Sequence, residues 1–226
     1  MTIKTLEPRL AKVGGVPIAR LLPNRGHQPI GAWCFLDHAG PVAFGEDDAG
    51  MQVGRHPHIN LQTFSWMLNG EVLHKDSLGN EQVITKNQVN VMTAGTGLTQ
   101  GISHTEQSIF PETGGSLDAA RGLSMVQLWI ALPTDQQIER GFHHYPKLPT
   151  WREDSAEMIL TTGSYVSVSG EHYKAPTIQY SKLVGIDVNF LEDGDVTLNL
   201  ESGFEYGVLV TEGQIESEGL MCQQDQ

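Results

Sequence analysis

The sequence contains little cysteine, little positive charge and no long apolar run. Its 226 residues include two cysteines, Cys34 and Cys222, whose wide separation matches neither a metal-binding nor a redox motif. We therefore expect reduced thiols in a cytoplasmic protein. Residues 1–15 lack the apolar core of a signal peptide, and no later stretch has the length of a membrane span, so neither secretion nor membrane insertion is expected.

Basic residues are scarce relative to acidic ones. Lys and Arg together number 14, whereas Asp and Glu number 27, which gives a net charge of −13. A surface this acidic repels phosphate backbones, and the sequence contains no basic cluster that would offset the repulsion. Direct nucleic-acid binding is therefore not expected.

Helical periodicity is also rare, whereas turn-forming residues are abundant. The chain has 25 glycines and 11 prolines, and they separate short segments rich in Val, Ile, Thr and aromatic residues. One such series lies within residues 29–133, and a similar one within residues 156–216. The pattern predicts an all-β protein of antiparallel sandwich or barrel type, built as two similar units.

We divide the chain into a first domain at residues 1–133, a connector at 134–155 and a second domain at 156–226. The connector is expected to hold one helical turn near residues 134–142. If the second unit matches the first in size, the chain ends midway through it, so an incomplete second unit is expected. The second domain has no H-x-H or H-x-E pair, which predicts that it binds no metal.

Two histidines flank a proline in His56-Pro57-His58, at the head of a strand-like run. Proline favours extended geometry in the residue before it, and residues i and i+2 of an extended chain point to the same face. His104 and Glu106 form a second such pair on a predicted strand. On facing strands of a small barrel, the two pairs would place three imidazoles and one carboxylate around one point.

This ligand set suits a divalent metal in an octahedral site with two open positions. Fe(II) is the leading candidate; Mn, Ni, Co and Cu are alternatives, and Zn prefers fewer ligands. Because protonated imidazole is not a ligand, metal affinity should fall as the pH drops through the histidine range near ~6.5.

The other histidines have simpler interpretations. His74, between Leu73 and Lys75, is interpreted as a surface residue of a strand. His143 and His144 lie in the connector, where adjacent residues of an extended chain face opposite ways. His27 and His172 have no evident partner in the sequence.

Several phrases of the first half resemble the pirin family of the cupin superfamily. In order along the chain they are "FLDHAGPV" (35–42), "HPHINLQTFSWMLNGEVLHKDSLGNEQVI" (56–84), "MTAGTG" (92–97), "ISHTE" (102–106) and "VQLWIALP" (126–133). The resemblance implies two cupin (jelly-roll) β-barrel units face to face, with the metal in the N-terminal unit. It also implies that His56, His58, His104 and Glu106 are the ligands of an iron ion.

The chain departs from the family pattern in three places. Gln62 stands where the general cupin motif has a carboxylate, and we interpret it as a residue that orients a ligand histidine. Residues 85–88 replace a Pro-Gly turn, where Asn87 is expected to supply the left-handed residue. The loop at residues 95–104 is longer than usual, and the ligand assignment requires it to bulge outward.

The resemblance implies either of two roles. One is a dioxygenase that acts on quercetin or a related flavonol with O₂, in which Glu106 or a neighbouring group accepts the proton of the substrate hydroxyl. The other is a metal-dependent, redox-sensing binding partner of a regulatory or metabolic protein, either monomeric or homodimeric. Four residues are candidates for the pocket wall, with core packing as the alternative for each: Phe64, Trp66, Met92 and Trp129.

Overall fold

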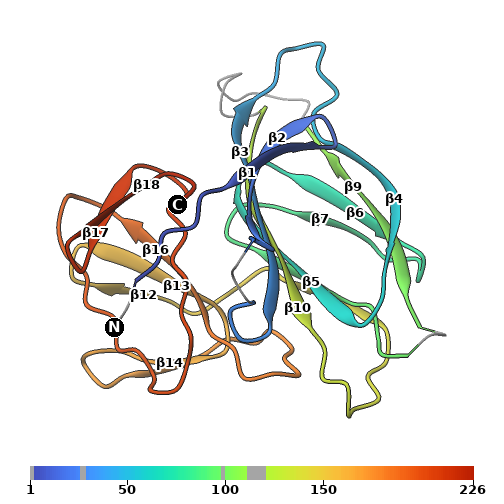
Figure 1. Cartoon of the computed structure of the whole chain (residues 1–226). Coiled ribbons are helices and arrows are strands. Elements are labelled where there is room, and N and C mark those ends of the chain that lie inside the picture. The colour runs from blue at the N-terminus through green and yellow to red at the C-terminus, as the bar shows by residue number, and fades with distance from the viewer. Residues whose placement is uncertain (1–2, 26–28, 98–99, 111–120) are drawn as a thin grey trace.

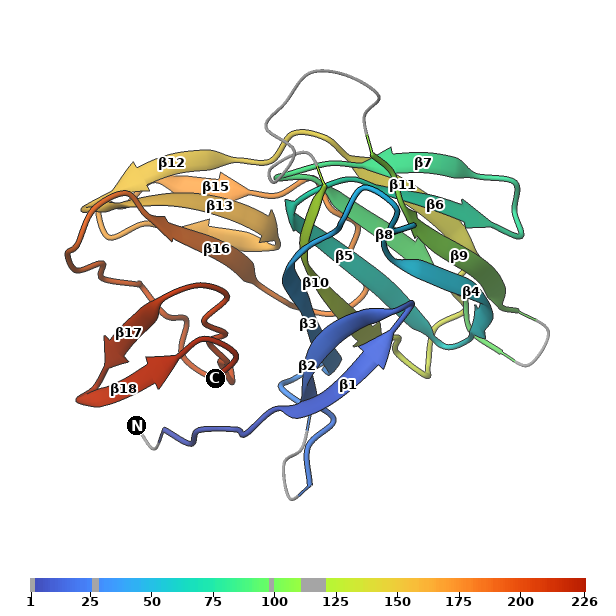
Figure 2. The same cartoon turned by 90° about the horizontal axis from the view of Figure 1, so that it is seen from above.

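The computed structural model describes residues 3–25, 29–97, 100–110 and 121–226. All regular secondary structure within these residues is β-strand. All neighbouring strands pair antiparallel. Figures 1 and 2 show an earlier group, from β1 to β11, beside a later group, from β12 to β18. The expected all-β class is confirmed.

The larger sheet of the earlier group has seven strands and forms one wall of a sandwich. In spatial order they are β1 (Arg9–Val13), β2 (Val16–Leu22), β3 (Trp33–Ala43), β10 (Gly122–Ala131), β5 (Leu61–Asn69), β8 (Val89–Thr93) and β11 (Gly141–Tyr145). The hairpin of β1 and β2 was not predicted from the sequence, although its alternating "VPIARLL" is buried at most positions.

The smaller sheet has four strands and forms the other wall. Its order is β4 (Gln52–His58), β9 (Ile102–Ser108), β6 (Val72–Asp76) and β7 (Glu81–Ile84). Apolar side chains from both walls share one core, in which Met67 and Leu123 of the larger sheet meet Val72 and Ile84 of the smaller one. Asn87, before β8, has the positive φ that the sequence predicted, and Gly79 in the β6–β7 turn also has positive φ.

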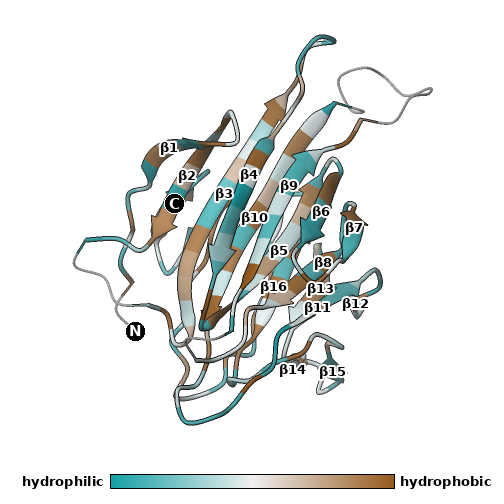
Figure 3. Ribbon diagram, turned by 90° about the vertical axis from the view of Figure 1, so that its right-hand side faces the viewer, coloured by the Kyte–Doolittle hydropathy of each residue, from teal (hydrophilic) through white to brown (hydrophobic). Residues whose placement is uncertain are grey.

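The larger sheet also buries side chains on its outer face. Successive residues of a strand point to opposite faces, and the long strands in Figure 3 accordingly carry bands of both colours. On the outer face, Phe64 and Trp66 pack in one cluster with Ile159 and Leu183 of the later group. The larger sheet therefore separates two cores, one inside the sandwich and one between the two groups of strands.

The later group is built of smaller sheets. They are β12 (Thr150–Glu153), β13 (Ala156–Thr162) and β16 (Gly185–Phe190); β14 (Ser164–Val166) with β15 (His172–Lys174); and β17 (Gln214–Ser217) with β18 (Leu220–Gln223). The strand expected at 195–200 does not form, and the one expected at 205–216 forms only at its end, in β17, so that residues 195–200 and 205–213 join no sheet of the described structure. These residues alternate in polarity, but no neighbouring strand pairs with them within the described part of the chain, and Val208 is 62% exposed.

The connector expected at residues 134–155 contains two β-strands, β11 and β12. Within it, β11 pairs with β8 of the larger sheet, and β12 pairs with β13 of the later group. The helical turn expected near residues 134–142 is wrong, because this segment makes a short turn and then enters β11. Since the segment contributes a strand to each group, the division into domains at 133 and 156 stays a prediction.

Both cysteines are free thiols, in agreement with the sequence interpretation. Among the described residues, none belongs to a helix long and apolar enough to cross a bilayer. The cytoplasmic location stays a prediction.

Two glycines with the same backbone geometry allow a test of close packing. Gly70, between β5 and β6, and Gly15, between β1 and β2, both have φ +88°. A Cβ atom at Gly70 would lie 2.2 Å from the carbonyl oxygen of Gly122, whereas a Cβ atom at Gly15 would meet open space. Gly15→Ala should lower the free energy of unfolding by about 1–2 kcal/mol through backbone strain alone. Gly70→Ala should cost about 1–3 kcal/mol more, because the strands must separate. Urea denaturation measures both, and equal losses would contradict the close approach.

Candidate metal centre

Three histidine side chains meet at one point inside the sandwich. The central strand of the smaller sheet, β9, pairs with β4 so that His56 lies directly opposite His104. The Nε2 atom of His104 is 3.0 Å from Nε2 of His56 and 3.1 Å from Nε2 of His58. The two predicted pairs thus lie on neighbouring, hydrogen-bonded strands rather than on facing ones, and alternation along each strand still brings their side chains together.

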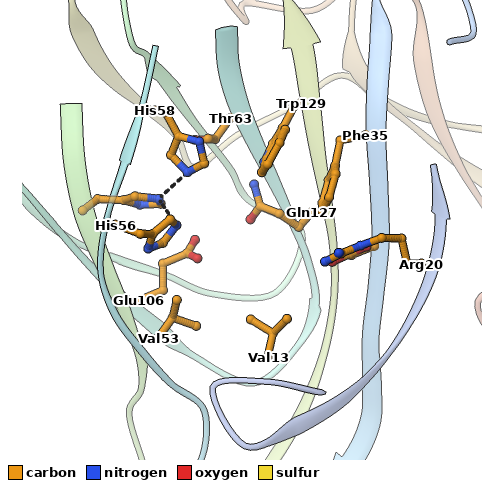
Figure 4. Close-up of a pocket in the computed structure, with 12 residues that line it drawn as sticks. Val13, Arg20, Phe35, Val53, His56, His58, Thr63, Glu106, Gln127 and Trp129 are labelled. Atoms are coloured by element: carbon orange, nitrogen blue, oxygen red, sulfur yellow. Dashed lines mark hydrogen bonds and ion pairs between the residues drawn. The ribbon is translucent and has the colours of Figure 1, made fainter. Parts of the chain in front are cut away.

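Glu106 lies on the same face of β9 as His104, opposite Val53 on one side and His74 on the other. Its carboxylate groups with the rings of His74 and His104, whereas His56, His58 and His104 form the three-imidazole cluster. Figure 4 shows Glu106 beside His56 in the same cavity. The fourth expected residue is therefore adjacent to the three imidazoles.

Removal from water keeps the rings of His58 and His104 uncharged near neutral pH. Burial, together with the neighbouring ring of His56, lowers the pKa of His58 to about 4. Burial and the three adjacent histidines lower the pKa of His104 to about 2. For these two rings, competition between protons and a metal lies well below the range near ~6.5 expected from the sequence.

The carboxyl group shifts in the opposite direction. Burial raises the pKa of Glu106 to about 7, and the neighbouring Ser65 hydroxyl partly offsets the rise. The charged form of a carboxylate is disfavoured away from water unless a cation lies nearby. In the metal-free protein, Glu106 thus changes charge near neutral pH.

The cluster fits a metal ion. The Nδ1–H of His56 donates to the Gly54 carbonyl at 2.9 Å, which leaves its Nε2 without a proton and directed at His104. Two imidazole nitrogens bound at right angles to one ion at about 2.1 Å are about 3.0 Å apart, close to both observed spacings. Neutral nitrogen donors beside a carboxylate suit a divalent ion of the first transition row.

The cluster opens into a cavity of about 330 Å³. Figure 4 shows the histidines and Glu106 on one side, and Phe35, Trp129 and Arg20 on the other. The rings of Phe35 and Trp129 stack at 4.0 Å, and the edge of Trp129 meets His58 at 5.0 Å. The cavity therefore places a flat aromatic wall opposite polar groups.

Arg20 adds an ion pair to this wall. Its guanidinium binds both carboxylate oxygens of the buried Asp37, at 2.7 and 2.6 Å, and lies 4.6 Å above the Phe35 ring. Gln127 also lines the cavity, and its side-chain carbonyl oxygen accepts a hydrogen bond from Ser65. The sequence analysis did not predict that Arg20, Phe35, Asp37 and Gln127 belong to the site. The alternation in Phe35-Leu36-Asp37 on a predicted strand indicates that Phe35 and Asp37 share one face.

Of the four predicted wall residues, Trp129 lines the cavity. Phe64 and Trp66 lie on the opposite face of β5, in the core shared with the later group, while Thr63 and Ser65 face the cluster. Met92 is 1% exposed and is not among the lining residues. Strand alternation was recognised in the sequence, but which face of β5 is the inner one was not.

Gln62 does not contact the histidine cluster in the described residues. It is fully buried on β5, and its side-chain NH₂ donates to the Thr93 hydroxyl at 3.0 Å. Gln62 and Thr93 lie opposite each other in β5 and β8. The residue that stands in place of the motif's carboxylate therefore joins these two strands by a side-chain hydrogen bond.

His74 is a correction to the sequence interpretation. It is 4% exposed rather than a surface residue, and its ring contacts His104 and Asp76. The same i, i+2 rule that selected the other pairs applies to His74 and Asp76 but was not used there. Burial lowers the pKa of His74, and Asp76 partly offsets the shift.

The remaining histidines lie elsewhere. The Nδ1–H of His144 donates a hydrogen bond to the side-chain carbonyl oxygen of Asn90 at 2.8 Å, and His172 is exposed on β15. His38, fully buried, contacts Asp225 and Ser124. His27 lies outside the described residues, as do residues 98–99 of the loop that was expected to bulge outward.

Sequence comparison gives related proteins along nearly the whole chain. The chain is 45% identical over 219 residues to "Putative quercetin 2,3-dioxygenase PA1205" of Pseudomonas aeruginosa, a match that covers 96% of this chain and 64% of that protein. It is 32% identical to "Pirin-like protein" of Caulobacter vibrioides, with 94% and 70% covered. The chain thus spans just under two thirds of the length of the first of these relatives.

Structure comparison agrees. A crystal structure of quercetin 2,3-dioxygenase from Acinetobacter baumannii superimposes with a TM-score of 0.80 and 42% sequence identity, covering 92% of this chain and 64% of that one. The Pirin family itself matches residues 15–130, which include the three histidines, Glu106 and every cavity-lining residue except Val13. With its sandwich, its cluster and these relatives, the chain belongs to the Pirin family.

Proposed function

We propose that the protein is a metal-dependent dioxygenase acting on quercetin or a related flavonol or aromatic enol. The observation that carries the proposal is the convergence of three imidazole nitrogens, two of them on rings with depressed pKa, at the wall of an aromatic-lined cavity. Two relatives whose names give this activity support it. The cavity of about 330 Å³ lies within the usual range of small-molecule sites, about 300–1,000 Å³.

His56, His58 and His104 would hold the ion, with Glu106 as the fourth ligand or as a base beside it. Fe(II) is the ion we propose, and Mn, Ni, Co and Cu suit the same donors. When bound, the metal supplies a Lewis acid for the substrate hydroxyl and brings O₂ next to the electron-rich ring. In the overall reaction, both oxygen atoms of O₂ enter the products and one ring carbon leaves as carbon monoxide.

The protein's own groups would prepare the substrate. Glu106, which a bound cation would keep ionised, is placed to accept the proton of the flavonol hydroxyl. Phe35 and Trp129 offer an apolar wall to a flat ring, while Gln127 offers a polar group on the same side of the cavity. Val13 and Val53 complete the lining and limit the water around the reacting atoms.

The ligand assignment is tested by single substitutions. His56→Ala or His58→Ala should abolish stoichiometric Fe(II) uptake in elemental analysis and leave the β-sheet circular dichroism unchanged. His144→Ala, which removes a histidine outside the cavity, is the control and should retain the metal. Full metal content in either cluster variant would refute the assignment.

Metal binding should release a proton from Glu106 near neutral pH. Because its pKa in the metal-free protein is raised to about 7, Glu106 is mostly protonated at pH 6 and mostly ionised at pH 8. Cobalt(II) binding should therefore release close to one proton more at pH 6 than at pH 8. Calorimetry in buffers of different ionisation enthalpy measures this difference, and Glu106→Gln should remove it. An identical difference in that variant would exclude Glu106 as its source.

Turnover tests the oxygenase proposal itself. The full chain is reconstituted with Fe(II) under anaerobic conditions, its metal content is measured, and air-saturated buffer with quercetin is added. Loss of quercetin absorbance with an equal amount of carbon monoxide is expected, and His56→Ala should show neither. Full occupancy without turnover, for Fe(II) and for each of the other first-row ions, would overturn the proposal.

A further inference from the structure

A chain of hydrogen bonds leads from His104 of the histidine cluster to His74 and on to Asp76. The Nδ1 atom of His104 is 3.3 Å from Nδ1 of His74, and Nε2 of His74 is 3.3 Å from Oδ2 of Asp76. The register of the sheet produces this chain, because β6 pairs with β9 so that Asp76 lies opposite His104 and His74 opposite Glu106.

The direction of each hydrogen bond follows from what its partners can donate. An ionised carboxylate only accepts, so the proton between His74 and Asp76 belongs to Nε2 of His74. A neutral His74 then has a bare Nδ1, which accepts the proton on Nδ1 of His104. Because His104 carries one ring proton and it is on Nδ1, its Nε2 is left with a free lone pair directed at His56 and His58.

Asp76 is itself fixed by the β6–β7 turn. Its Oδ1 atom accepts hydrogen bonds from the backbone amides of Leu78 and Asn80, at 2.9 and 3.1 Å, and the Asn80 side-chain NH₂ donates to both Oδ1 and Oδ2, at 3.1 and 2.9 Å. These bonds outweigh the effect of burial and lower the pKa of Asp76. With Oδ1 held by three donors of the turn, Oδ2 is the atom that faces His74.

His74 is fixed as well. Its ring stacks on Phe142 of β11 with centroids 4.4 Å apart and planes 16° apart, and its exposure is only 4%. Both the position and the plane of the ring are therefore set by packing, so that its two nitrogens have one partner each among the described residues.

We propose that Asp76 and His74 are positioning residues that fix the tautomer of His104, so that its Nε2 lone pair is available to the metal. This inference rests on the proposed metal site. Partners of this kind, which orient a ligand without touching the metal, typically change metal affinity 10–100-fold when removed.

The turn makes Asp76→Asn a sharp test. The two backbone amides that donate to Oδ1 would hold the carbonyl oxygen of the new amide, which leaves its NH₂ to face His74. The chain of hydrogen bonds then reverses: His74 accepts at Nε2 and donates from Nδ1, and His104 carries its proton on Nε2. A shape-preserving substitution thus places a proton where the metal should bind.

The tautomer is measured in the metal-free protein by long-range ¹H–¹⁵N correlation spectra of histidine-labelled samples, with His104→Asn to assign the His104 signals. In the wild type, a protonated Nδ1 and a bare Nε2 are expected; Asp76→Asn should exchange them and weaken cobalt(II) binding by about 10–100-fold. His74→Phe is a second variant, which keeps the stacking on Phe142 and should also release the preference of His104 for the Nδ1 proton.

Two controls separate this role from general loss of structure. Asp47→Asn makes the same chemical change at an exposed position, and Asn80→Ala removes one donor of the turn while leaving the carboxylate facing His74. Both should keep the wild-type tautomer and bind cobalt(II) within about twofold of the wild type. A bare Nδ1 on His104 in the wild type, or an unchanged tautomer in Asp76→Asn, would overturn the inference.

The outcome for metal binding is distinguishable from the outcome for the tautomer. If the wild type binds no cobalt(II) but the tautomer exchanges in Asp76→Asn, the proposed function fails and the assignment of Asp76 and His74 stands. If the wild type binds cobalt(II) and the tautomer does not change, the reverse holds.

Discussion

The register of β9 between β4 and β6 is the constraint on which the site depends. One pairing places His56 opposite His104, and the other places Asp76 opposite His104 and His74 opposite Glu106. A shift of a single residue in either pairing would turn one set of side chains to the other face of the sheet. The cluster, its neighbouring carboxyl group and the chain of hydrogen bonds behind it are therefore fixed together by one set of backbone contacts.

This arrangement is unfavourable for the isolated side chains. Imidazoles packed at 3.0 and 3.1 Å away from water resist protonation, and Glu106 beside them resists ionisation. A cation at the cluster relieves both effects, since it satisfies the nitrogen lone pairs and favours the carboxylate. The same balance of charge would link metal binding to proton release from Glu106.

The larger sheet connects the site to the rest of the chain. Its inner face supplies the wall of Phe35, Trp129 and Gln127, and its outer face packs Phe64 and Trp66 against the later group of strands. The cavity wall and the contact with the later group thus use opposite faces of the same sheet. A change of shape at the outer face would be transmitted to the cavity wall through one layer of backbone.

The sequence by itself determined the β class, the acidic surface and the two i, i+2 pairs, because alternation and turn residues are local properties that short segments carry. Tertiary structure decided the rest. Only pairing with β9 showed that His74 and Asp76 lie beside His104, and only the sandwich showed which face of β5 is inside. The strand-like residues near 200 form no strand, since they pair with no neighbour in the part of the chain that the structure describes. These outcomes depend on which distant segments meet, and composition and spacing do not encode that choice locally.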